Sequence, residues 1–263
     1  MHRKVRGNRH SDRMLEPNIE PSAGLGTQTK SSDKDQLSHM LRAVLFDNDG
    51  VLVDTEALFF QANRDTLTKA GIDLSLDRYV EYALRKGKSC LDLAAERGWS
   101  ASQISDLRDQ RDRAYSAMLA EVPGPMDHVR HTLSRLRGRF RMGVVTTSNA
   151  EHFYLVHRRF NLLEYFDFVI AREDYNHPKP NPEPYRAALE RMRLSTDECV
   201  AVEDSERGLM AANAAGLRCV VVPHGLTRSG DFSKATAILP ALSALPSFLE
   251  SIYFHRSSLR IAR

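Results

Sequence analysis

The sequence predicts an α/β fold in which a doubly wound parallel sheet carries an inserted all-helical domain. Three observations lead to this prediction. From residue 124 onward, short apolar runs of strand length alternate with stretches of helical periodicity. These runs are apolar throughout, which is typical of parallel strands that are covered on both faces. Residues 57–123, by contrast, show helical periodicity and contain no strand pattern.

The first predicted strand spans residues 41–46 and ends at an acidic turn, Asp47-Asn48-Asp49-Gly50. The insert after it is predicted as a series of helices, and glycine marks the ends of the first three: Gly71, Gly87 and Gly98. Beyond Pro123-Gly124-Pro125, the predicted helices span residues 129–136, 152–160, 184–192 and 206–215. The strands predicted between them span residues 142–145, 166–170, 199–202 and 219–222.

These patterns divide the chain into parts. Residues 41–56 and 124–245 are predicted to form the α/β core, residues 57–123 the helical domain, and residues 246–263 a frayed tail. Residues 1–40 have few large apolar side chains and no periodicity, so they are predicted to be a disordered leader. Because Met40 stands directly before the first strand, residues 1–39 have two open interpretations: a leader, organelle targeting included, or an extension upstream of the true initiator.

Charge and composition exclude several kinds of partner. The formal net charge is +3, but residues 1–39 hold seven basic and five acidic side chains, which leaves +1 for the rest. We therefore expect no nucleic-acid partner. No apolar run approaches the roughly 18–20 residues of a membrane span, so we expect no membrane insertion. Three cysteines without a CxxC pair favour a reducing, cytoplasmic location. The expected partner is a small phosphorylated metabolite, and the expected state is a monomer or weak dimer.

Polar side chains follow the predicted strands where ligands bind in such sheets, at the carboxyl ends. They are Asp47, Asp49, Thr146, Thr147, Lys179 (past a short loop), Glu203 and Asp204. This set suits phosphoryl transfer, because a dianionic ester and a carboxylate nucleophile repel each other unless cations lie between them. Asp47 and Asp204 can hold Mg²⁺, and Lys179 adds a second positive charge. Thr146 and Thr147 can bind phosphate oxygens. Asp47 can attack phosphorus, and Asp49 can act as the general acid and base.

The motifs resemble those of the haloacid dehalogenase-like (HAD) hydrolase superfamily. Residues 46–56 (FDNDGVLVDTE) resemble its nucleophile motif, Thr146 its hydroxyl motif, Lys179 its lysine motif, and residues 202–205 (VEDS) its acidic motif. The resemblance implies a Rossmann-like core, dependence on Mg²⁺ and a helical cap at residues 57–123. It also implies that the backbone carbonyl of Asp49 binds the metal and that Glu203 supports the metal site.

The amino-acid sequence of the first motif is similar to that found in sugar-phosphate phosphatases and β-phosphoglucomutase-like members of the superfamily. Such mutases place a histidine where Phe59 stands, and Asp49 argues against dehalogenases and phosphonate hydrolases. The sequence therefore predicts a Mg²⁺-dependent phosphomonoester hydrolase for a small sugar or polyol phosphate, with a β-phosphoglucomutase-like phosphomutase as the alternative.

Three cations of the helical domain are candidates for substrate specificity: Arg85, Lys86 and Lys88. Gly87-Lys88 resembles a pair found in pentulose-bisphosphate phosphatases, and cations there could bind a second anionic group. The competing interpretation is a solvated helix end, where basic residues are favourable.

Overall fold

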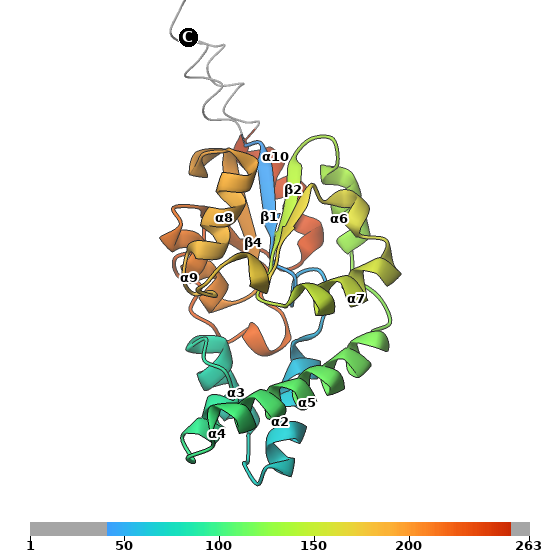
Figure 1. Ribbon diagram of the computed structural model, residues 1–263. Helices are drawn as coiled ribbons and strands as arrows, with labels where there is room; N and C mark the ends of the chain where they lie inside the picture. The colour runs from blue at the N-terminus through green and yellow to red at the C-terminus, as the bar shows by residue number, and fades with distance from the viewer. Residues whose placement is uncertain (1–40, 254–263) are drawn as a thin grey trace, which may run out of the picture.

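The computed structural model describes residues 41–253 and shows one six-stranded parallel sheet in the order β3-β2-β1-β4-β5-β6 (Figure 1). The strands are β1 (Ala43–Phe46), β2 (Arg141–Val145), β3 (Phe168–Ile170), β4 (Cys199–Glu203), β5 (Arg218–Val221) and β6 (Ala237–Ile238). Strand β1 lies in the middle of this sheet, β2 and β3 extend it toward one edge, and β4, β5 and β6 extend it toward the other. The prediction of a doubly wound parallel sheet is thereby confirmed.

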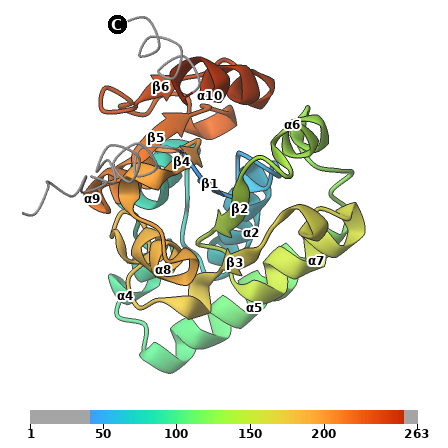
Figure 2. The same cartoon turned by 90° about the horizontal axis from the view of Figure 1, so that it is seen from above.

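Helices cover both faces of the sheet (Figures 1 and 2). One face packs against α6 (Val129–Leu136), α7 (Ala150–Phe160) and α10 (Leu245–Tyr253), and the other against α8 (Glu183–Met192) and α9 (Glu206–Ala214). Successive side chains of β1 point to opposite faces of the sheet. Phe46 packs in the hydrophobic core cluster that contains Phe153 of α7, and Leu45 packs in the separate cluster that contains Tyr185 of α8. Short helical turns complete the core: η2 (Leu163–Tyr165), η3 (Arg172–Asp174), η4 (Thr196–Glu198), η5 (Gly225–Thr227) and η6 (Leu242–Ala244).

The helical domain lies beyond one end of the sheet (Figure 1). It consists of α2 (Glu56–Lys69), α3 (Leu76–Tyr79), the π-helical segment η1 (Val80–Arg85), α4 (Asp92–Ala95) and α5 (Ala101–Ala120). Ser100 and Gln103 form a capping box that begins α5, the longest of these helices. The domain has its own buried cluster, but Tyr115 and Leu119 of α5 belong to the main core. The packing of α5 therefore joins the helical domain to the sheet.

The C-terminal segment differs from its prediction. Residues 246–253 are not a frayed tail but the body of α10, and Leu245 and Leu249 are fully buried in the main core. These two leucines lie four residues apart on one helix face, and their burial holds this short helix against the core. The short edge strand β6 was also not predicted. Residues 254–263 and the predicted leader, residues 1–40, lie outside the described residues.

Between residues 41 and 253, no helix is long and apolar enough to cross a bilayer.

The turn after β1 is held in place from α7. Backbone N–H groups of residues 51–53 donate to the carbonyl oxygen of Asn48 and close the turn. The side-chain Oδ1 of Asn48 lies 2.6 Å from Nε2 of His157. This histidine is fully buried and stacks on Phe153. Burial lowers the pKa of His157 to about 4, so the ring is neutral and donates its Nε2 proton to Asn48. This bond fixes the turn that carries Asp47 and Asp49.

The burial of α10 can be tested by truncating one side chain. We expect Leu249→Ala to lower the free energy of unfolding by roughly 2–5 kcal/mol, because it leaves a cavity in the main core. Urea denaturation measures the change. Ser247→Ala, at an exposed position of the same helix, is the control and is expected to change stability little. Equal stability of Leu249→Ala and the wild type would contradict the packing described here.

The buried histidine makes stability depend on pH. In the unfolded chain His157 titrates near 6.5, and in the folded protein near 4. Its contribution to stability is therefore complete above pH 6.5 and is lost as the pH falls toward 4, up to about 3 kcal/mol. In His157→Gln, whose amide can still donate to Asn48 but does not titrate, we expect the free energy of unfolding to fall less over this range. If the free energy of unfolding depended on pH in the same way for wild type and His157→Gln, this interpretation would be wrong. The control is His131→Gln, at an exposed position.

Candidate active site

The strand register places two carboxylates side by side. Phe46 of β1 is paired with Val202 of β4, so Asp47 stands level with Glu203, and the Asp47 N–H donates to the Val202 carbonyl oxygen at 2.9 Å. Side chains alternate along each strand, so Asp47 follows Leu45 onto the face covered by α8 and α9. Glu203 follows Ala201 onto that same face. Both carboxylates thus point toward the segment that carries Lys179.

The ammonium group of Lys179 joins these strands. Its Nζ donates to Asp47 Oδ1 at 2.8 Å, to Glu203 Oε1 at 2.6 Å and to the Val145 carbonyl oxygen at 2.8 Å. The lysine and Glu203 are buried, at 2% and 0% exposure of their side chains. Buried charges are stable in a protein only when they are paired and hydrogen-bonded, as these are. The ammonium group of Lys179 therefore binds oxygen atoms at the ends of β1, β2 and β4.

The carboxylates outnumber this cation. Burial and the nearby charge of Glu203 raise the pKa of Asp47 to about 7, although Lys179 acts to lower it. Burial, with the charges of Asp47 and Glu203, raises the pKa of Asp204 well above its ordinary value. Burial lowers the pKa of Lys179, but the two carboxylates beside it raise that pKa by more, so the lysine stays charged. The site therefore has an excess of negative charge that a further cation would neutralise.

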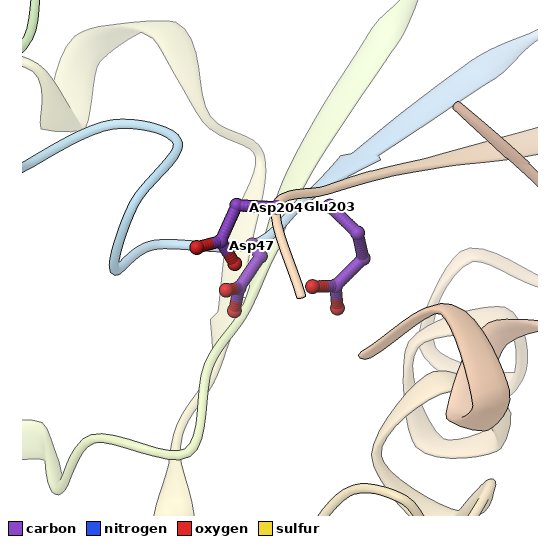
Figure 3. Close-up of side chains that lie close together, drawn as sticks. All are labelled: Asp47, Glu203 and Asp204. Carbon is purple, nitrogen blue, oxygen red and sulfur yellow. The ribbon is translucent and has the colours of Figure 1, made fainter. Parts of the chain in front are cut away.

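The donor set fits a hard divalent cation such as Mg²⁺. Oxygen atoms of Asp47, Glu203 and Asp204 lie within 4.8 Å of one another at the ends of β1 and β4 (Figure 3). Both oxygens of Glu203 are used, Oε1 by Lys179 and by the Tyr185 hydroxyl at 2.6 Å, and Oε2 by Ser205 at 3.4 Å. Asp47 and Asp204 each keep one carboxylate oxygen without a hydrogen bond within residues 41–253. These two residues suit direct ligation, and Glu203 suits a supporting role.

A glycine permits the close approach at this point. Gly50 has φ of +80°, and a Cβ atom there would lie 2.1 Å from Oδ2 of Asp204. The same Oδ2 accepts a hydrogen bond from Thr227 at 2.9 Å. Only glycine allows the turn after β1 to pass this carboxylate.

Asp49 stands apart from the other carboxylates and is held by hydroxyl groups. Ser148 donates to its Oδ2 at 2.8 Å, Thr146 donates to the same atom at 3.4 Å, and Thr55 donates to Oδ1. The side chain is partly exposed, unlike Asp47. Three donors fix the direction of this carboxyl group, and its partial exposure leaves it access to a reacting group.

The loop after β2 contributes the predicted hydroxyl groups. Thr146 is fully buried, its Oγ1 accepts from the Ser148 N–H at 3.0 Å, and its carbonyl oxygen accepts from Tyr175 at 2.9 Å. Thr147 is partly exposed, and its Oγ1 lies 3.5 Å from Nη2 of Arg207. The structure thus brings Asp47, Asp49, Thr146, Thr147, Lys179, Glu203 and Asp204 to one edge of the sheet.

The cations predicted in the helical domain have other partners. Arg85 pairs with Glu81 at 3.3 Å and donates to the Ser229 carbonyl oxygen at 3.5 Å. Lys86 pairs with Glu81 at 3.1 Å, and the ammonium group of Lys88 lies 5.3 Å from the centre of the Tyr82 ring. The hydrogen bond to Ser229 places Arg85 at the contact between the helical domain and the core. The side chains of Arg85, Lys86 and Lys88 are all exposed.

Sequence reasoning did not single out three residues of the site: Tyr185, Thr227 and Arg207. Tyr185 and Thr227 orient Glu203 and Asp204 through single hydrogen bonds. Both lie far from their partners in the sequence, and neither residue type signals such a bond. Arg207 had a usable signal, since it lies three residues after Asp204 at the start of a predicted helix at the same sheet edge.

Comparison with known proteins places this site in a family. A sequence model of the family described as haloacid dehalogenase-like hydrolase matches residues 44–222, which is more than half of the chain. Protein CbbY from Cereibacter sphaeroides is 32% identical over 220 residues, covering 78% of this chain and 94% of that protein. The phosphorylated carbohydrates phosphatase of Thermotoga maritima is 30% identical over 203 residues, covering 75% of this chain and 93% of that protein.

Solved structures agree with this assignment. CbbY from Rhodobacter sphaeroides in complex with phosphate has a TM-score of 0.69 and 29% identity, covering 78% of this chain and 96% of that one. A variant of the same protein in complex with xylulose-(1,5)bisphosphate also has a TM-score of 0.69, with 28% identity and the same coverage. The resemblance predicted from the motifs is confirmed, as is the prediction of an enzyme: the chain belongs to the haloacid dehalogenase-like hydrolase family.

Proposed function

We propose that this protein is a Mg²⁺-dependent phosphatase that hydrolyses monoesters of small sugars or polyols through a phosphorylated Asp47. The contact that carries the proposal is that of Lys179 with Asp47 at 2.8 Å, beside the carboxylate of Asp204. A buried carboxylate that keeps one free oxygen, next to a buried cation, is arranged to attack an anionic centre. The names of the relatives support this proposal, since one is a phosphorylated carbohydrates phosphatase and another a hexitol phosphatase.

The first half of the reaction transfers the phosphoryl group to the protein. Oδ2 of Asp47 attacks phosphorus, and the bond between phosphorus and the ester oxygen breaks. Oδ1, which accepts from Lys179, is then the Asp47 oxygen that remains for the metal. Lys179 offsets charge on Asp47 and the phosphoryl oxygens, and Thr146 and Thr147 lie beside the same strand end as oxygen-binding groups. Held by Asp47 and Asp204, Mg²⁺ would neutralise the remaining negative charge between nucleophile and ester.

Asp49 is proposed to move the protons. In the first half it gives a proton to the leaving ester oxygen, so that a neutral alcohol departs. In the second half it takes a proton from water, which attacks phosphorus and releases inorganic phosphate and the free carboxylate of Asp47. The three hydroxyls around Asp49 keep it directed for both steps.

The helical domain, residues 57–123, is proposed to act as a cap over this site. Its α2 begins at Glu56, immediately after Thr55, which donates to Asp49. A Cβ atom on Gly87 would lie 3.0 Å from Cδ of Pro180, the residue after Lys179. The helical domain therefore contacts both the turn after β1 and the lysine segment, which suits a part that closes over a bound ester and excludes water.

The phosphomutase alternative receives less support. The position at which such mutases carry a histidine is occupied by Phe59, whose ring lies 5.0 Å from the Tyr115 ring and 5.0 Å from the Arg111 guanidinium. An aromatic side chain packed in this way cannot transfer protons with sugar hydroxyls. Conversion of β-glucose 1-phosphate to the 6-phosphate in the presence of a bisphosphate primer would favour the mutase instead.

Removing the nucleophile tests the reaction. We expect Asp47→Asn to lower phosphate release from a hexitol phosphate more than about a thousandfold, because an amide cannot form the phosphorylated carboxylate. Phosphate release under saturating Mg²⁺ measures the rate. Asp73→Asn, an exposed position in the helical domain, is the control and should keep the wild-type rate. Turnover by a correctly folded Asp47→Asn protein at the wild-type rate would contradict the mechanism.

Binding of Mg²⁺ can be tested separately from activity by measuring the thermal stability of the protein. Saturating Mg²⁺ at about a hundred times its Kd should stabilise the folded protein by about 2.7 kcal/mol and raise its Tm. The rise should be larger at pH 8 than at pH 6, because protonation of Asp47, with its pKa raised to about 7, competes with the ion. Calorimetry with and without EDTA measures the shift.

In Asp204→Asn we expect most of this Mg²⁺-dependent rise to disappear, while Asp73→Asn keeps it. A Tm that does not respond to Mg²⁺ in the wild type, or responds equally in Asp204→Asn, would contradict a metal site at these residues.

A further inference from the structure

Arg207 crosses the site above the proposed nucleophile. It is the second residue of α9, which follows β4, and its Nη2 lies 3.5 Å from Oγ1 of Thr147, which follows β2. The sheet order is β2-β1-β4, so β1 lies between these two strands. A side chain that reaches from the end of β4 to the loop after β2 therefore passes over the end of β1, where Asp47 stands.

The guanidinium group of Arg207 keeps most of its hydrogen-bonding capacity. An arginine has five N–H donors. Within residues 41–253, the side chain of Arg207 makes this one long hydrogen bond to Thr147 and no ion pair within 4.0 Å. Burial lowers the pKa of Arg207, but the carboxylates of Glu56 and Asp47 act to raise it. The group is thus a half-buried cation among carboxylates that it does not touch, with donors available to a ligand.

Glu56 is the acidic residue with which the helical domain begins on this side of the site. It is the first residue of α2 and is half-buried, and the hydroxyl of Tyr79 donates to its Oε1. Burial raises the pKa of Glu56, and Arg207 is the largest charge acting to lower it. The Tyr79 bond orients the carboxylate without neutralising it. Thr55, the residue before Glu56, donates to Asp49, which also accepts from Thr146 and Ser148 of the loop after β2. Arg207 reaches Thr147 of that same loop, so a donor from the core and an acceptor from the helical domain both lie beside it.

The charge of the site limits what can lie between them. Asp47, Asp49, Glu56, Glu203 and Asp204 supply five formal negative charges, and Lys179 and Arg207 supply two positive ones. Mg²⁺ would bring this formal sum from −3 to −1, and the dianionic phosphoryl group would return it to −3. A second phosphate on the substrate would add two more negative charges at close range. Of the three candidate cations of the helical domain, Arg85 and Lys86 are paired with Glu81, and the ammonium group of Lys88 lies over the Tyr82 ring.

We propose that Arg207 and Glu56 determine substrate specificity by binding hydroxyl groups of an uncharged leaving group, so that the preferred substrate is the monophosphate of a polyhydroxylated compound. Arg207 donates to hydroxyl oxygens, and Glu56 accepts from hydroxyl protons, a pairing that matches the two-sided character of a sugar or polyol. A second phosphate would meet Glu56 as a like charge. This inference rests on the phosphatase function proposed above and specifies its leaving group.

Three esters test the inference on the full-length enzyme with Mg²⁺: a hexitol monophosphate, a pentulose bisphosphate and phenyl phosphate, which has no hydroxyl groups. The quantity measured is kcat/KM for each ester, for the wild type and for Arg207→Gln, Arg207→Lys and Glu56→Gln. Arg228→Gln, at an exposed position of the core, is the matched control. Circular dichroism and the Tm establish that each variant is folded, and Arg207→Lys keeps the charge if loss of the cation disturbs folding.

We expect the wild type to prefer the hexitol monophosphate to the bisphosphate. The ratio of kcat/KM for hexitol monophosphate to that for phenyl phosphate should fall about ten- to a hundredfold in Arg207→Gln and in Glu56→Gln, and should not change in Arg228→Gln. The same ratio of kcat/KM values in Arg207→Lys should lie between those of the wild type and Arg207→Gln, because one ammonium group replaces the planar set of guanidinium donors.

Two results would overturn the inference while leaving the proposed function in place. One is an unchanged ratio in folded Arg207 and Glu56 variants, and the other is a wild-type preference for the bisphosphate. Failure of the wild type to hydrolyse any of the three esters, phenyl phosphate included, would instead overturn the proposed function and the inference with it.

Discussion

The ammonium group of Lys179 lies between the carboxylates of Asp47 and Glu203, and the site depends on this contact. Without the lysine, two buried carboxylates on adjacent strands would repel each other at a cost that the fold would have to offset elsewhere. With it, one oxygen of Asp47 is held and the other stays free. The same ammonium also binds the carbonyl oxygen at the end of β2, so that three strand ends have a fixed relative position.

The parallel sheet makes this convergence possible. Side chains that follow β1, β2 and β4 emerge at one edge, and the register sets Asp47 level with Glu203. Residues outside the strands then orient each group: Tyr185 holds Glu203, Thr227 holds Asp204, and His157 holds the turn through Asn48. None of these three is proposed to touch the substrate. Each instead fixes a group that positions Lys179, the proposed metal or the turn that carries Asp47 and Asp49.

Much of this arrangement could be predicted from the sequence, because strand ends are visible as apolar runs that stop at polar residues. Such strand ends pointed to Asp47, Asp204 and Lys179 and to a doubly wound parallel sheet that carries them. Sequence reasoning failed where side-chain direction decides the outcome. Whether a helical cation points at the site or at a neighbouring acid cannot be read from spacing, so Arg85, Lys86 and Lys88 were candidates beside a competing interpretation, and Arg207 was not singled out. The short helix α10 was also missed, because its position depends on the burial of Leu245 and Leu249 against residues far away in the sequence.

The central claim is that Asp47 carries the phosphoryl group during turnover, with Lys179 and the metal compensating charge. The most direct measurement is acid quenching of the wild-type enzyme within its first turnover on a ³²P-labelled hexitol phosphate, followed by peptide mapping. We expect transient, alkali-labile label on the peptide that contains Asp47 and no label in Asp47→Asn. Release of labelled phosphate at the turnover rate without protein-bound label, or label at another residue, would contradict it.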